Sequence, residues 1–174
     1  MILVCPISRL GETVEQSRAR HVVTLVRDDE LVRRERTQLL RNGIAPDDHL
    51  WLQMDDIADE IDGMIAPSEK HVDQLVTFLD RWDRAQPMVV HCFAGISRST
   101  AAAFIAACAL SPERDEDEIA ARLRAASATA TPNSRLVALA DAYLGRQGRM
   151  TRAVDRIGFG LGAYEAAPFG LKLD

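Results

Sequence analysis

The first half of the chain alternates short hydrophobic runs with amphipathic stretches. Four runs predict buried strands, over residues 2–5, 21–26, 49–54 and 88–91. The charged stretch 28–41 and the stretch 68–82 predict helices between them, with Ser68 as a candidate N-cap of the second. Strands interleaved with helices are typical of an α/β domain. We expect a central, mainly parallel sheet of four to five strands flanked by helices.

The second half predicts helices only. Residues 99–110 (STAAAFIAACAL) are apolar on every side, which is typical of a helix buried in the middle of a domain. Ser111 and Pro112 predict the start of another helix, Asn133 predicts the N-cap of a third, and 150–157 predict a last short helix. Glycines and prolines make the remainder irregular. We therefore expect a domain over residues 1–158 and a C-terminal tail over 159–174.

Composition narrows the class of protein. A chain of 174 residues predicts one domain, and a net charge of −5 argues against nucleic acid or an anionic membrane as a partner. No run approaches the ~18 apolar residues of a membrane span, and the apolar N-terminal run is too short for a secretion signal. Cys5, Cys92 and Cys108 suggest no disulfide framework, so we expect a cytoplasmic protein. The oligomeric state stays open.

Candidate chemistry is concentrated in residues 91–100, HCFAGISRST, which join the fourth strand to the buried helix. Backbone N–H groups of a tight loop that enters a helix form an anion-binding nest. Gly95 permits the turn, and Arg98 offers a planar fork of donors for two phosphate oxygens. Cys92 at the mouth of this nest would face a helix N-terminus and a guanidinium, which both favour thiolate over thiol. The segment therefore predicts a phosphate-binding loop that also carries a nucleophile.

The residues HCFAGISRS resemble the HCxxGxxR[S/T] signature of the protein tyrosine phosphatase superfamily. The compact dual-specificity group and the small bacterial tyrosine phosphatases are the most similar, and the resemblance covers residue 1 to about 147. It implies a cysteine-dependent phosphomonoester hydrolase that acts on phosphotyrosine, with dual specificity as an extension. Its substrate would be a phosphorylated protein or a small phosphomonoester, and it would use neither metal nor cofactor.

The resemblance also implies roles for individual residues. Cys92 would attack phosphorus and form a phosphocysteine, Ser99 would ease departure of the sulfur, and His91 would orient the cysteine. Arg98 and the loop amides would stabilise charge in the transition state. The implied substrate-binding residues are Phe93, Ala94, Gly95, Ile96, Ser97 and Arg98.

A general acid is needed to protonate the leaving group. The family supplies an aspartate from a loop that follows a strand, which here is the segment DDIADEID at 55–62. Asp56 is the preferred candidate, and the alternatives are Asp55, Asp59, Glu60 and Asp62. The segment Thr131-Pro132-Asn133 resembles a Pro-Asn step that related small phosphatases carry at the start of a late helix, near the phosphate loop. We interpret Asn133 first as an N-cap and second as a support for that loop.

Alternatives to a phosphotyrosine phosphatase remain. One is an inactive phospho-ligand binding module on the same fold, which would usually have lost the cysteine, the arginine or the acid. Another is a rhodanese-like sulfur transferase, in most of which the loop between cysteine and arginine is shorter. The uncharged residues at the variable loop positions argue against a polyphosphoinositide substrate, because family members that take such lipids carry lysines there. Cys5, on the first strand, is either an inert core residue or a redox partner of Cys92.

Overall fold

A five-stranded sheet forms the centre of the computed structural model, which describes residues 1–27 and 30–173. The strands are β1 (Ile2–Pro6), β2 (His21–Leu25), β3 (His49–Leu52), β4 (Met88–Cys92) and β5 (Phe169–Leu171), in the order β3-β2-β4-β1-β5. The first four run parallel, and β5 pairs antiparallel with β1. The predicted α/β fold with a mainly parallel sheet is confirmed. The strand β5 was not predicted, because a three-residue segment in a glycine-rich stretch carries no periodic signal.

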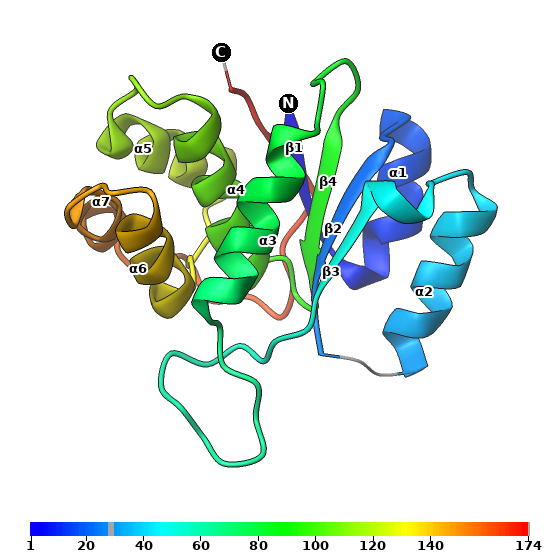
Figure 1. The fold of residues 1–174 in the computed structure, drawn as a ribbon, viewed down its shortest axis with the longest axis horizontal. Coiled ribbons are helices and arrows are strands. Elements are labelled where there is room, and N and C mark those ends of the chain that lie inside the picture. Colours follow the sequence, from blue (N-terminus) through cyan, green and yellow to red (C-terminus); the bar gives the residue numbers. More distant parts are fainter. Residues whose placement is uncertain (28–29, 174) are drawn as a thin grey trace.

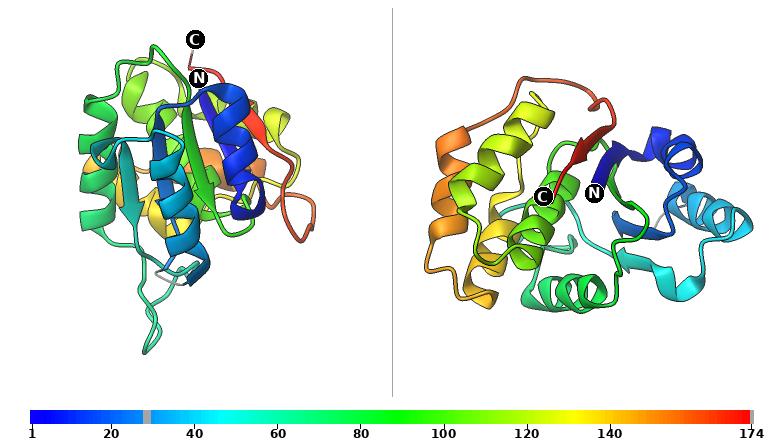
Figure 2. Two further views of the ribbon diagram at one scale, coloured as in Figure 1. Left: turned by 90° about the vertical axis from the view of Figure 1, so that its right-hand side faces the viewer. Right: turned by 90° about the horizontal axis from the view of Figure 1, so that it is seen from above.

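Two layers of helices cover the sheet (Figures 1 and 2). The helices α1 (Leu10–Ser17) and α2 (Glu30–Arg41) cover one face. The other face carries α3 (Glu69–Asp80), α4 (Arg98–Leu110), α5 (Glu116–Ala126), α6 (Ser134–Tyr143) and α7 (Arg149–Ile157). The predicted helix at 28–41 is confirmed from Glu30 onward, while Asp28 and Asp29 lie outside the described residues. The helix α1 was missed because it buries only Leu10 and Val14.

The predicted start of a helix at Ser111 and Pro112 is wrong. Ser111 is the C-cap of α4, and the next helix begins at Glu116. Asp115 is the N-cap, since its carboxylate accepts hydrogen bonds from the backbone N–H groups of Asp117 and Glu118. A carboxylate that accepts two of the free N–H groups stabilises the helix start and complements the helix dipole. The Ser-Pro step therefore lies in the turn between the helices.

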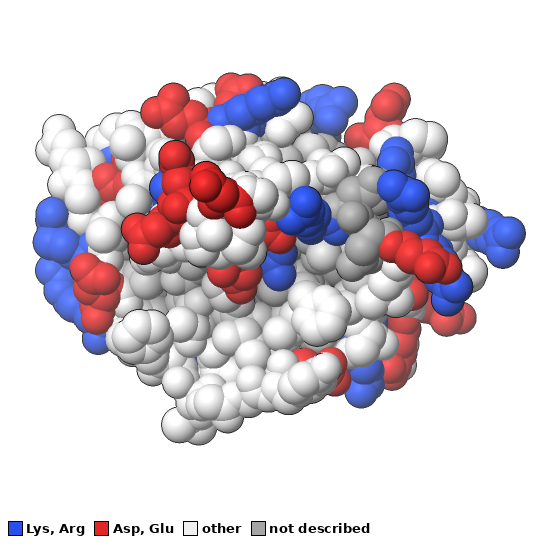
Figure 3. Space-filling model, turned by 90° about the horizontal axis from the view of Figure 1, so that it is seen from below, with Lys and Arg blue, Asp and Glu red and all other residues white. Residues whose placement is uncertain are grey.

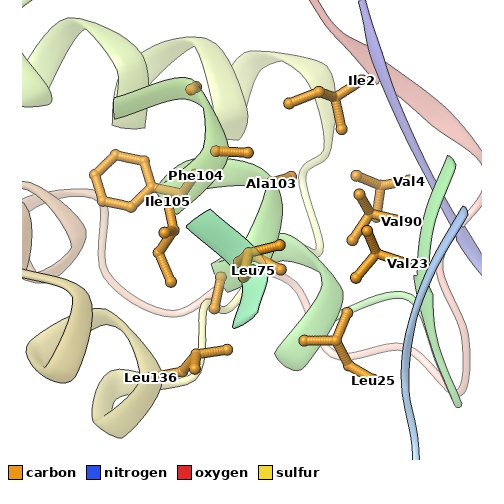
Figure 4. Close-up of a cluster of buried hydrophobic side chains, with 14 of the residues drawn as sticks. Ile2, Val4, Val23, Leu25, Leu75, Val90, Ala103, Phe104, Ile105 and Leu136 are labelled. Carbon is orange, nitrogen blue, oxygen red and sulfur yellow. The ribbon is translucent and has the colours of Figure 1, made fainter. Parts of the chain in front are cut away.

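The helix α4 forms the middle of the hydrophobic core, as predicted. Every residue from Arg98 to Cys108 is buried, and its alanines let the helix backbone lie close to the sheet. Phe104 and Ile105 point from α4 toward the other helices, while Val4, Val23 and Val90 line the sheet (Figure 4). Close packing on both sides holds the N-terminus of α4 at the end of β4.

The carboxyl ends of the four parallel strands open at one end of the molecule, which is the usual position of ligand sites in such sheets. Three segments that are far apart in the sequence meet there (Figure 1): the turn between β4 and α4, the loop between β3 and α3, and the segment between α7 and β5. Figure 3 shows this end, on which a broad uncharged area borders acidic side chains. Among the described helices, none has the length and apolarity that a bilayer crossing requires.

Candidate active site

The turn between β4 and α4, residues 93–97, is called the anion loop below. Four of its carbonyl oxygens accept backbone N–H groups from outside the loop: Phe93 from Ile7 (3.1 Å), Ala94 from Ala166 (2.8 Å), Ile96 from Thr131 (2.9 Å) and Ser97 from Asn133 (3.3 Å). In a trans peptide the N–H of the following residue points opposite to the carbonyl, so this outward anchoring turns the N–H groups of residues 94, 95, 97 and 98 toward the inside of the loop. Within the described chain, the N–H groups of residues 94–97 donate to no protein acceptor. They are free to bind an anion.

Gly95 is required by the shape of the anion loop. Its φ is +72°, in the left-handed region that residues with a side chain rarely adopt. A Cβ atom at this position would lie 2.8 Å from the backbone nitrogen of Pro6 and 2.9 Å from the backbone carbon of Cys5. The loop therefore lies directly against the end of β1, and neither backbone segment can move aside cheaply.

Cys92 ends β4 and is only 1% exposed. Its Sγ lies 3.1 Å from the Oγ of Ser99, which is fully buried in the first turn of α4. A hydroxyl at this distance can donate a hydrogen bond to a sulfur that carries negative charge. The two residues that the sequence paired are thus in contact.

Arg98, at the start of α4, is nearly buried and is held by one hydrogen bond from Nη1 to the backbone oxygen of Met54, 2.8 Å away. Its Nε is buried and, among the residues that the structure describes, has no hydrogen-bond partner. It forms a long ion pair with Asp56, whose Oδ2 lies 3.7 Å from that nitrogen. Because buried charged donors in proteins normally have a hydrogen-bond acceptor, the lack of one at Nε indicates a position for a bound anion.

The structure separates the acids of residues 55–62, called the acid loop below. Asp56 Oδ1 accepts hydrogen bonds from Ser97 Oγ (2.7 Å) and from Asn133 Nδ2 (2.9 Å), so its carboxyl lies at the edge of the anion loop. Asp55 instead accepts the backbone N–H of Ile65 at 2.7 Å and braces its own loop. Glu60 pairs with Arg135. Asp59 and Asp62 are exposed and, among the described residues, form no hydrogen bond or ion pair with the anion loop.

Asn133 combines the two interpretations given to it. It is the N-cap of α6, since its Oδ1 accepts the N–H of Leu136 at 3.0 Å. Its Nδ2 donates to Asp56 and, at 3.3 Å, to the backbone oxygen of Ile57, and its N–H donates to Ser97. One side chain therefore fixes the distance between the helix α6, the acid loop and the anion loop.

His91 lies behind the anion loop in a buried hydrogen-bonded row that the sequence did not predict. Its Nε2 lies 2.7 Å from Thr24 Oγ1, and the same hydroxyl lies 2.8 Å from His49 Nε2. Burial lowers the pKa of His91 to about 3, and repulsion from His49 adds to the effect. Burial likewise lowers the pKa of His49 to about 4, with a smaller contribution from Arg36. Both rings are therefore neutral at pH 7.

The other two cysteines are free and buried. Burial raises the pKa of Cys5 and of Cys108 to about 12, which disfavours the reactive thiolate. Cys5 pairs with His91 in the sheet and packs in the core beneath α1, while Cys92 belongs to the core around α4. Among the described residues, no group of three or more histidine, cysteine, aspartate or glutamate side chains is arranged so that it could hold a metal ion.

Comparison with known proteins confirms the resemblance. The protein-tyrosine phosphatase family model matches residues 62–130, which contain the anion loop. Among solved structures, the PTP-2 phosphatase of Cydia pomonella is 20% identical with a TM-score of 0.63, over 81% of this chain and 84% of that one. PTPMT1 is 15% identical with a TM-score of 0.62, and the match covers 89% of this chain and 95% of PTPMT1. DUSP15 is 16% identical with a TM-score of 0.56, and the match covers 91% of this chain and 92% of DUSP15. No curated protein matches.

Proposed function

We propose that this chain, a protein tyrosine phosphatase-like phosphoric monoester hydrolase, removes phosphate from phosphotyrosine through a covalent phosphocysteine on Cys92. The observation that carries the proposal is the Nε of Arg98, which donates no hydrogen bond to the described residues, next to the inward-facing amides of the anion loop. Together they offer donors on several sides of one small volume beside the Cys92 sulfur, and a phosphate group supplies the matching oxygens.

In the first step, the thiolate of Cys92 attacks phosphorus while the bond from phosphorus to the leaving oxygen breaks. Asp56 gives its proton to that oxygen, which departs as a phenol or alcohol. Arg98 and the amides of the anion loop bind the equatorial oxygens, where negative charge gathers in the transition state. The two bonds that Asp56 receives from Ser97 and Asn133 fix the direction of its carboxyl group.

In the second step, water attacks phosphorus and the bond from sulfur to phosphorus breaks. The Asp56 carboxylate takes a proton from that water, so the acid is restored for the next cycle. Ser99 donates a hydrogen bond to the departing sulfur, and its Oγ is already 3.1 Å from it. The products are inorganic phosphate and the free thiolate.

The choice of phosphotyrosine rests on the rim of the site. Phe93 is 47% exposed on the anion loop and offers an aromatic surface beside the phosphate position. The other variable positions, Ala94, Ile96 and Ser97, carry no charge that would bind further phosphates of an inositol ring. Faster turnover of inositol polyphosphates than of phosphotyrosine peptides would overturn this choice of substrate.

Turnover of p-nitrophenyl phosphate and of phosphotyrosine peptides tests the proposal. Cys92→Ser should abolish turnover, and a chelator should have no effect. Asp56→Asn should lower kcat on phosphotyrosine peptides by about 10²- to 10⁴-fold, the usual contribution of a general acid. Asp55→Asn is the matched control in the neighbouring position and should act mainly on stability. Phosphate binding without any turnover would favour a binding module, and equal losses at the two aspartates would reject Asp56 as the acid.

A further inference from the structure

A cavity lies beside the anion loop and is called the side pocket below. Its volume is about 420 Å³, which falls within the range of about 300–1,000 Å³ typical of ligand pockets. It is lined by Asp56, Ala58, Ser97, Thr131, Pro132, Asn133, Ser134, Val154, Asp155, Gly158 and Phe159. Cys92 and Arg98 are not part of this lining, so the side pocket lies beside the phosphate position and does not include it. Ser97 and Asp56 border both, so a group in the pocket would lie next to the leaving group.

The lining combines apolar surface, uncharged polar groups and negative charge. Ala58, Pro132, Val154 and Phe159 provide carbon surface, and the lining contains two aspartates and no cation. Phe159 is 92% exposed, which leaves its ring available for contact. Such a lining suits a long side chain with an apolar stem and a cationic end.

Asp155 is the aspartate that is free to bind such an end. Asp56 is already engaged by Ser97 and Asn133. In contrast, Asp155 is exposed on α7 and has no side-chain hydrogen bond or ion pair within the described chain. The nearest arginines of its own helix are held elsewhere: Arg156 pairs with Asp117, and Arg152 donates to the backbone oxygen of Gln147 at 3.3 Å.

We infer that the side pocket binds an arginine or lysine that lies next to the phosphorylated residue of a protein substrate. The inference rests on the proposed function, because the phosphate in the anion loop fixes the position of the neighbouring residue. The cationic end would meet Asp155, while its stem would cover Pro132, Val154 and Phe159. The net charge of −5 and the acids of the acid loop favour approach of a basic peptide and oppose approach of an anionic lipid surface.

Phosphotyrosine peptides that differ at one position test this inference. Arginine, norleucine or glutamate is placed in turn at each of the two positions on either side of phosphotyrosine, and kcat/KM is measured. At one of these positions the peptide with arginine should have a kcat/KM about two- to fivefold higher than the peptide with norleucine, which is the effect of one partly exposed ion pair. The peptide with glutamate should have the lowest kcat/KM. Added salt should reduce the preference.

Substitutions of Asp155 complete the test. Asp155→Asn should bring the kcat/KM ratio of the arginine peptide to the norleucine peptide close to one. Asp155→Lys should reverse the preference, so that the glutamate peptide has the highest kcat/KM. The matched control is Asp47→Asn, which removes the same charge from an exposed turn before β3 and should change neither ratio. An unchanged ratio in Asp155→Asn, or norleucine equal to arginine in the unaltered protein, would overturn the inference. Turnover of p-nitrophenyl phosphate should stay constant in all three variants. Its absence from the unaltered protein would instead count against the proposed function.

Discussion

The hydroxyl of Thr24 joins His91 to His49 in the buried row behind the anion loop, at 2.7 and 2.8 Å. A hydroxyl has one proton, so it donates to one imidazole nitrogen and accepts from the other. This arrangement fixes opposite tautomers on the two neutral rings. Replacing Thr24 with valine keeps the shape of the side chain and removes both hydrogen bonds. The two imidazole nitrogens then have no partner in a region that excludes water.

The cost of Thr24→Val follows from these two orphaned groups. A buried polar group without a partner costs about 1–3 kcal/mol, so we expect a loss of about 2–6 kcal/mol in the free energy of unfolding. That is a large share of the about 5–15 kcal/mol by which domains are stable. We also expect a lower kcat, because His91 lies directly before Cys92 and would lose the contact that orients its ring. Thr24→Ser is the matched control, since it keeps the hydroxyl and removes one methyl group at a cost of about 1 kcal/mol.

Urea unfolding of the three proteins at pH 7, followed by circular dichroism, measures these differences. The reasoning predicts the order wild type, Thr24→Ser, Thr24→Val, with the larger step between the two variants. Turnover of p-nitrophenyl phosphate at pH 7 is measured on the same samples at urea concentrations where each remains folded. A valine variant as stable and as active as the serine variant would refute the proposed role of the hydroxyl.

Two further predictions concern the anion loop and the buried histidines. Gly95→Ala places a Cβ at 2.8 Å from the backbone of Pro6 and should abolish turnover. Gly63→Ala is the control: Gly63 has a similar φ of +78°, but no atom lies within 4 Å of the added Cβ, so turnover should stay unchanged. Equal effects of the two substitutions would show that backbone conformation alone matters. The lowered pKa values of His91 and His49, about 3 and about 4 against 6.5 in the unfolded chain, mean that the unfolded chain binds more protons below about pH 6.5. Stability is therefore retained above pH 6.5 and falls toward pH 4, at about 1.4 kcal/mol per pH unit for each ring; a flat urea series between pH 7 and pH 5 would contradict this.

The anion loop could be predicted from sequence because its chemistry is local. The strand, the turn and the buried helix follow one another between residues 88 and 110, so the residues that bind an anion and the cysteine are brought together by one short segment. The acid loop was identified through the family resemblance and its place after a strand, and Asp56 was preferred among its acids, but the contacts that distinguish Asp56 from the others are long-range. Only the fold brings Asn133 and Ser97 to Asp56 and leaves Asp55 to brace its own loop.

The buried row shows why other parts could not be predicted. Thr24 contacts His91 because β2 and β4 pair in the register that places these two residues opposite each other. His49 joins them from β3, whose pairing with β2 places it beside Val22 on the same face. Register depends on the packing of the whole sheet, and a polar residue in a hydrophobic strand does not reveal its partner. A threonine and two histidines in separate strands gave no sign that they form one network.

The segment after α7 shows the same dependence on long-range structure within the site itself. The sequence offered it only as an irregular tail, yet Ala166 donates its backbone N–H to the carbonyl of Ala94 in the anion loop at 2.8 Å. That bond turns one amide of the loop inward, and Phe159 of the same segment lines the side pocket. The strand β5 then anchors the segment to the open edge of β1. The geometry that would bind phosphate is therefore completed by residues more than 70 positions away from the cysteine, and a catalytic unit defined by the signature alone would lack one of the contacts that shape it.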